Sequence, residues 1–135
     1  MANFKKGINM RVLIFLFFPF LTFADVQKCV DDYNSAIVEK NNALSAFKLA
    51  KSQKTAADGV ISAAERKTYI KEAKASVLSA IDILARSENI LKFVKLECIQ
   101  SIKDKADEIS KKNISDLGEF EQFRKDMDLT LQLPK

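Results

Sequence analysis

Apolar side chains recur with the period of an α-helix along most of this chain. One such stretch covers residues 26–58, and a second covers residues 62–112, about fifty residues without glycine or proline. In the second stretch, apolar residues return every seven positions, which places them on one buried helical face: Ile70, Val77, Leu84, Leu91 and Cys98. The pattern predicts two long amphipathic helices, over about 26–58 and 63–112.

The short segment between these stretches carries signals for the end of one helix and the start of the next. Gly59 stands where a glycine in the left-handed conformation commonly ends a helix. Ser62 and Glu65 have the spacing of a capping box, in which two side chains bond to free backbone N–H groups at a helix start. We therefore expect an antiparallel αα-hairpin with a tight turn at 59–61.

The second predicted helix has one weak point, at residues 86–89. A straight helix over 63–112 would be about 75 Å long, whereas a compact domain of this size has a radius of gyration of about 13 Å. Charged and amide side chains interrupt the apolar face at 86–89, and Ser87 can cap a new helix. The sequence leaves two alternatives open, a break at 86–89 or a continuous rod.

The C-terminal part of the chain predicts a shorter helix and a tail. Residues 113–115 would end the long helix, and Asp116 with Glu119 can cap a helix over about 117–128. One face of this helix would carry Phe120, Phe123 and Met127. Residues 129–135 alternate apolar and polar side chains, which is the period of a strand. With no partner strand in the sequence, we expect an extended tail over the bundle.

The composition agrees with a helical fold. The 135 residues include only three glycines and two prolines, which disfavours a turn-rich β fold. The expected fold is all-α, a small antiparallel bundle of three to four helices built on the long αα-hairpin. The chain has no histidine, so it lacks the commonest general base and metal ligand.

The first twenty-four residues have the parts of a secretory signal peptide. An apolar run over 12–21 is followed by small residues that end at Ala24, and a basic segment precedes it, with Lys5, Lys6 and Arg11. We expect a signal peptide over 1–24 and a single mature domain over 25–135, secreted or periplasmic. The alternative, an uncleaved anchor, has an apolar run much shorter than the roughly twenty residues that span a bilayer. We therefore expect no stable membrane span after cleavage.

The two cysteines, Cys29 and Cys98, both lie on the predicted core faces. In an oxidising compartment they predict one disulfide, which would stabilise the fold by about 4 kcal/mol in the chain-entropy model. If both helices start level at the turn, the cysteines differ by about 10 Å along the hairpin. A kink near residue 86 or tilted helices would close this gap. Free thiols and intermolecular bonds in a dimer are the alternatives.

The sequence shows no catalytic, cofactor or metal signature. Its neighbouring carboxylates have Lys or Arg within one helical turn, the usual pattern of a solvated helix face, and no serine lies in a glycine-rich elbow. Two cysteines without histidine do not make a structural zinc site. Asn113 begins an N-glycosylation sequon, which has meaning only in a eukaryotic source. We expect no enzyme and no cofactor.

Charge and surface then indicate the class of function. Three of the 22 basic residues lie in the signal segment, so 19 remain against 18 acidic residues, and nucleic acid is not an expected partner. We expect an exported module that binds another protein, of inhibitor, immunity or adaptor type, as a monomer or homodimer. The alternative is a carrier of a small apolar ligand in the bundle core. The candidate partner contacts, each with core packing as its rival role, are Tyr69, Phe93, Phe120 and Phe123.

Overall fold

The protein is a bundle of three long helices. The computed structural model describes residues 23–133, with α2 over Phe23–Gly59, α3 over Ala63–Glu97 and α4 over Gln100–Gln132. Residues 1–22 of the predicted signal peptide lie outside the described residues. The all-α bundle is confirmed, with three helices, a disulfide and no strand between residues 23 and 133.

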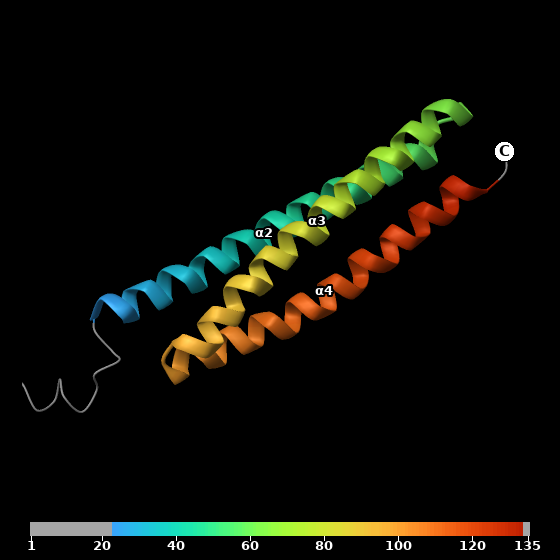
Figure 1. Cartoon of the computed structure of the whole chain (residues 1–135). Helices are drawn as coiled ribbons and strands as arrows, with labels where there is room; N and C mark the ends of the chain where they lie inside the picture. Colours follow the sequence, from blue (N-terminus) through green and yellow to red (C-terminus); the bar gives the residue numbers. More distant parts are fainter. Residues whose placement is uncertain (1–22, 134–135) are drawn as a thin grey trace, which may run out of the picture.

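The helices run up, down and up along an elongated rod (Figure 1). α2 and α3 form the antiparallel hairpin expected from the sequence, and α4 returns beside α3, so that it lies parallel to α2. The hairpin therefore provides most of the packing surface, and α4 closes one side of it.

A seven-residue period sets the packing between α2 and α3. The buried residues of α2 at this period are small: Cys29, Ala36, Ala43, Ala50 and Ala57. The corresponding residues of α3 are larger: Ile70, Val77, Leu84 and Leu91, followed by Cys98. Because small side chains on one helix meet large ones on the other, the two backbones can approach closely along the whole hairpin. A strict seven-residue repeat is also the pattern of helices that wind around each other with a left-handed supercoil.

α4 carries a buried stripe with the same period. Its members are Ala106, Asn113, Phe120 and Met127. A second stripe on α3 lies level with them and consists of Ala73, Ala80, Ser87 and Val94. Met127 shares a core cluster with Ala73, and Phe120 shares one with Ala80, so the large side chains of α4 fill the space over alanines of α3.

Of the two alternatives that the sequence left open at 86–89, the break is wrong, because α3 passes through these residues as a regular helix. Ser87 faces the core and does not cap a new helix. Its hydroxyl donates to the carbonyl of Ala36, with 2.8 Å between the oxygens, and accepts a hydrogen bond from Nδ2 of Asn113 at 3.2 Å. The polar side chain is thus satisfied across the three helices, and the backbone has no reason to leave the helical conformation.

Asn113 explains why the helix end predicted at 113–115 is also wrong. Its side chain is buried, and besides Ser87 its Nδ2 group donates to Glu88 at 3.0 Å. Its Oδ1 atom accepts from Lys40 of α2, which also pairs with Asp116. In the folded chain the Nδ2 atom of Asn113 is therefore not accessible to a glycosylating enzyme.

The chain reverses instead at Cys98 and Ile99, and α4 then continues without interruption to Gln132. The short helix predicted over 117–128 is part of this longer helix, and the extended tail predicted from 129 is wrong up to Gln132. Leu131 packs against the cluster that contains Met127, one helical turn earlier. Tertiary packing of this leucine overrides the alternating pattern, which was too short to specify a strand on its own.

The hairpin connection agrees with the sequence in part. Ser62 caps α3, and its hydroxyl accepts from the backbone N–H of Glu65 at 3.4 Å, which is one of the two hydrogen bonds of the predicted capping box. Gly59 is the last residue of α2, and no described glycine has a positive φ, so the expected left-handed glycine is wrong. α2 ends at Gly59 because the chain continues in an extended conformation to Ser62.

The predicted disulfide between Cys29 and Cys98 is confirmed, with the Cα atoms 5.7 Å apart. No kink is needed to close it. With equal rise in both helices, this pairing places Gly59 level with Thr68, so α3 begins about 7 Å beyond the end of α2. Figure 1 shows the start of α3 projecting past α2. The two helices therefore do not start level at the turn, and residues 60–62 span the offset between the end of α2 and the start of α3.

Gly118 lies inside α4 in open space, and a Cβ atom added there would meet nothing within 4 Å. We expect Gly118→Ala to raise the free energy of unfolding by about 1 kcal/mol, since glycine loses more backbone entropy in a helix. Urea unfolding followed by circular dichroism measures the change. Gly59→Ala, at the last residue of α2, is the control with a smaller expected gain. A loss of stability in Gly118→Ala would contradict the prediction.

Candidate interaction surface

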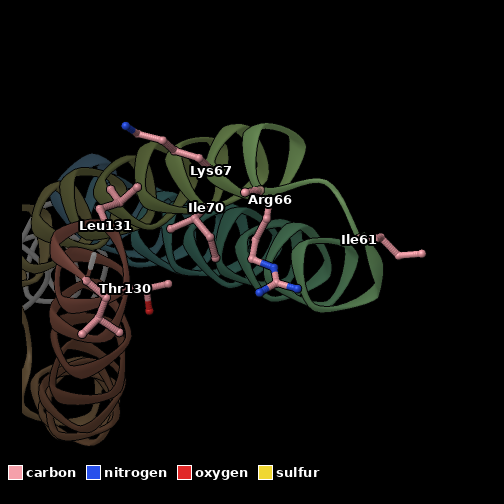
Figure 2. Close-up of a pocket in the computed structure, with 8 residues that line it drawn as sticks. Ile61, Arg66, Lys67, Ile70, Thr130 and Leu131 are labelled. Atoms are coloured by element: carbon pink, nitrogen blue, oxygen red, sulfur yellow. The ribbon is translucent and has the colours of Figure 1, made fainter. Parts of the chain in front are cut away.

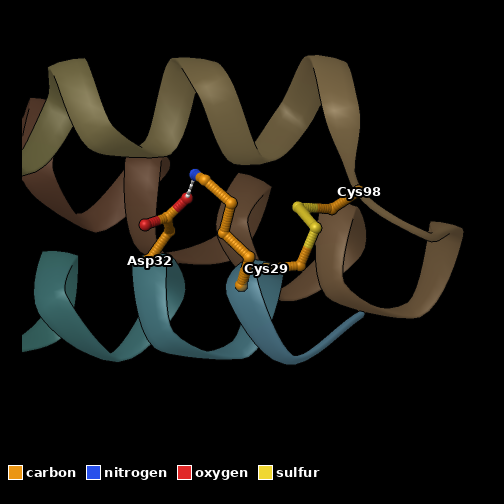
Figure 3. Close-up of a disulfide and its surroundings, with 4 residues drawn as sticks. Cys29, Asp32 and Cys98 are labelled. Atoms are coloured by element: carbon orange, nitrogen blue, oxygen red, sulfur yellow. Dashed lines mark hydrogen bonds and ion pairs between the residues drawn. A yellow bond between two sulfur atoms is a disulfide. The ribbon is translucent and has the colours of Figure 1, made fainter. Parts of the chain in front are cut away.

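A groove lies beside the disulfide, between the first turns of α2 and the last turns of α3. We call it the disulfide groove. It has a volume of about 670 Å³. One wall is formed by Asp25, Lys28 and Asp32 of α2, the other by Ile90, Phe93, Leu96 and Glu97 of α3, with Cys29 and Cys98 between them. Figure 3 shows the bond bridging the two helices at this end of the rod.

Helical spacing puts these residues on one side of the hairpin. Residues 25, 28, 29 and 32 of α2 cover about two turns of one helix face, as do 90, 93, 96 and 97 of α3. All the lining residues come from the hairpin and its disulfide, and none from α4. The groove is therefore open on the face of the hairpin that α4 leaves uncovered.

Two large apolar side chains stand at the groove without cover. Phe93 is 65% exposed and Leu96 is 76% exposed, while Ile90 packs partly against the cluster around Leu91. Single exposed apolar residues are ordinary on protein surfaces, but adjacent ones beside a concave surface are typical of a contact site.

The groove carries more acid than base. Lys28 forms an ion pair with Asp32 at 2.6 Å, visible in Figure 3. This hydrogen bond, together with the negative charges of Asp32 and Glu97, raises the pKa of Lys28 above its ordinary value. Asp32 pairs with the only lysine of the lining, and Glu97 adds a negative charge on the α3 wall.

A second pocket, of about 440 Å³, lies at the other end of the rod. It is formed by the hairpin tip, the start of α3 and the end of α4 (Figure 2). Arg66 lines it but also donates from its guanidinium to the carbonyl of Val60 at 3.1 Å, which supports the end of α2. Ile61 is fully exposed at the tip and points away from α4 in this view. Two exposed apolar residues line this pocket as well, Ile61 and Leu133, but they come from the hairpin tip and from the end of α4, whereas Phe93 and Leu96 are neighbours on one helix.

The structure separates the four aromatic residues that the sequence proposed as partner contacts. Phe93 alone is largely exposed. Tyr69 and Phe123 are half-buried against the cluster around Met127, and Phe123 also meets the ring of Phe47 edge-on at 5.4 Å. Phe120 is completely buried, with its ring 4.3 Å from that of Phe47. Phe120 is therefore a core residue, and its place among candidate contacts is corrected.

Sequence reasoning missed Leu96. Its position three residues after Phe93, and off the stripe that ends at Leu91 and Cys98, is the signal that could have identified it. Both side chains lie outside the buried periodicity yet next to each other on the helix.

Two further features of the described part of the chain bear on function. Between residues 23 and 133, no three or more His, Cys, Asp or Glu side chains gather as a metal site would require. None of the helices described has a stretch long and apolar enough to cross a bilayer. Comparisons with protein-family models, with curated proteins and with solved structures find no match to this chain.

Proposed function

We propose that this protein is an exported, non-catalytic module that binds another protein through the disulfide groove. The observation that carries the proposal is the pair Phe93 and Leu96, exposed next to each other at the rim of a concave surface. Aromatic and other large apolar side chains in such positions commonly supply most of the binding energy of a protein interface.

The walls of the groove supply the rigidity that such a site needs. Both walls are helical, and the disulfide fixes the distance between them. A surface held in its binding geometry loses little conformational entropy on association. The groove is thus suited to a partner that inserts side chains between two fixed helices.

The lining also indicates the chemistry of the partner. An apolar or aromatic side chain of the partner would contact Phe93 and Leu96. A basic residue beside it would meet Glu97, which lines the α3 wall of the groove. Such complementarity speeds association and selects among partners more than it adds affinity.

Export rests on the sequence and agrees with the disulfide. A signal peptide over residues 1–24 would deliver the chain to an oxidising compartment, where a bond such as Cys29–Cys98 persists. Cleavage after Ala24 would leave the mature terminus one helical turn before Cys29. The intact mass of the protein from its host, with and without reductant, tests the cleavage site and the bond together.

The function is tested with the oxidised protein as bait in the extracytoplasmic fraction of its host. A partner is first captured with the unaltered chain and identified. Phe93→Ala and Leu96→Ala are each expected to weaken its binding by roughly tenfold, the effect of losing an interface anchor. Leu49→Ala, which removes a 53% exposed leucine from α2 outside the groove, is the matched control and should bind normally.

Two outcomes would overturn this proposal. Equal binding by all variants would place the contact elsewhere on the molecule. A purified protein without a partner, but with a small apolar molecule in its native mass spectrum, would favour the carrier. For that alternative, the pockets at the two ends of the rod are the places to look, because the core layers are filled by side chains.

A further inference from the structure

The connection between α3 and α4 has none of the usual chemistry of a helix turn. It consists of Cys98 and Ile99, both in extended conformations, and no glycine or proline lies between Ser62 and Lys112. Ile99 occupies the N-cap position of α4 without a side-chain hydrogen bond to the free N–H groups. The local sequence thus favours a continuous helix, as the sequence pattern predicted, and only tertiary packing keeps the chain bent.

Core positions also continue through this connection at helical spacing, with a shift of one position in the seven-residue register between Cys98 and Ala106. Successive core positions remain three or four residues apart on both sides of it: Leu91, Val94, Cys98, Ile102, Ala106, Ile109 and Asn113. A helix continued through Cys98 and Ile99 would therefore present one unbroken apolar face. A turn between two independent helices does not require this continuity.

α4 is the element that can leave. The disulfide fastens α2 to α3, whereas α4 is held by side-chain contacts that an identical α4 from a second chain can reproduce. The contacts of α3 with α4 lie symmetrically about Gln100: Ser87 and Asn113 are equally far from it along the chain, and so are Ala80 and Phe120. Two straight helices crossing antiparallel at Gln100 would place the same pairs opposite each other.

We propose that α3 and α4 join into a single helix in a second state of this chain, and that two copies in this state exchange α4 and form a two-fold symmetric dimer. The partner is a second copy of the same chain, and the surface is the face of the α2–α3 hairpin that α4 covers in the monomer. Because the exchanged element is identical, the dimer keeps every contact between helices that the monomer has. Only the bend at the connection between α3 and α4 is lost. The Cys29–Cys98 bond remains within each hairpin.

The bend can be tested by two substitutions at one residue. Ile99→Pro fits the monomer, because Ile99 has φ −66° and ψ 155° and Cys98 has the extended conformation favoured before proline. In a continuous helix the same proline would remove a hydrogen bond and clash with the preceding turn. Ile99→Ala truncates the same side chain but remains compatible with both states.

The oxidised chain and both variants are refolded at high concentration, and their masses are measured by light scattering after gel filtration. We expect a twofold mass for the unaltered chain and for Ile99→Ala, and loss of this species in Ile99→Pro. A strictly monomeric unaltered chain, or an equal dimer fraction in Ile99→Pro, would overturn the proposal.

Cross-linking identifies which element is exchanged. The Nζ atom of Lys74 in α3 lies 2.6 Å from Oδ1 of Asp128 in α4, within reach of a zero-length carbodiimide cross-link. In a dimer refolded from mixed ¹⁵N-labelled and unlabelled chains, exchange predicts cross-linked peptides that combine a heavy and a light half. Cross-linked peptides of one isotope only, in the isolated dimer, would show side-by-side association and refute the exchange.

Discussion

Replacing Cys29 and Cys98 together by alanine is expected to lower the free energy of unfolding by about 4 kcal/mol. The bond joins residues that are 69 positions apart, so its loss frees a long loop in the unfolded chain. This is a large fraction of the 5–15 kcal/mol that native domains typically retain. Chemical denaturation of the oxidised protein and of the double variant measures the difference.

Reduction of the unaltered protein by an excess of dithiol is the matched control, because it breaks the bond without changing a side chain. The reduced protein and the double variant should have similar denaturation midpoints, and the double variant should not respond to the dithiol. The free energy of unfolding should fall more steeply with denaturant concentration in the protein without the bond, because its unfolded chain exposes more surface. Equal midpoints for oxidised and reduced protein would show that the bond contributes nothing to stability.

The α2–α3 hairpin and its disulfide could be predicted because they depend on patterns that extend over many turns. The seven-residue repeat from Ile70 to Cys98 identifies one buried face whatever lies between its members. The cap at Ser62 is a local signal that is independent of tertiary structure.

The helix ends could not be predicted where a polar residue faces the core. Ser87 and Asn113 look like interruptions in a single sequence, and become core residues only because each supplies the hydrogen-bond partner of the other. Nothing local shows that residues 26 positions apart will meet. Conversely, the real reversal at Cys98 and Ile99 has no local signal, because the packing of α4 on the hairpin imposes it.

The candidate interaction surface could also be predicted only in part from the sequence. Phe93 could be proposed as a contact residue from its position off the buried stripe. Whether it is an isolated exposed residue or part of a contact site depends on the groove that the disulfide and α2 create beside it. Phe120 could not be distinguished from Phe93 by residue type. Only the seven-residue spacing of Phe120 with Asn113 and Met127, once α4 is known to be continuous, assigns it to the core.

The contrast between these two phenylalanines gives the second large prediction. Phe120→Ala is expected to lower the free energy of unfolding by about 3–5 kcal/mol, the range for removing a buried aromatic ring and leaving a cavity. Phe120 is fully buried, contacts the ring of Phe47 and fills the space over Ala80 at the centre of the rod. Its neighbours belong to three different helices and are therefore poorly placed to collapse into the space.

Phe93→Ala removes the same number of atoms from a ring that is 65% exposed, and it should change stability by less than about 0.5 kcal/mol. Urea unfolding of the two variants beside the unaltered chain measures both effects under one condition. The same two variants are expected to respond in the opposite order in partner binding, where Phe93→Ala loses affinity and Phe120→Ala, while folded, does not. A large stability loss for Phe93→Ala would mean that its ring is packed in the native protein, and the disulfide groove would then lose its principal contact residue.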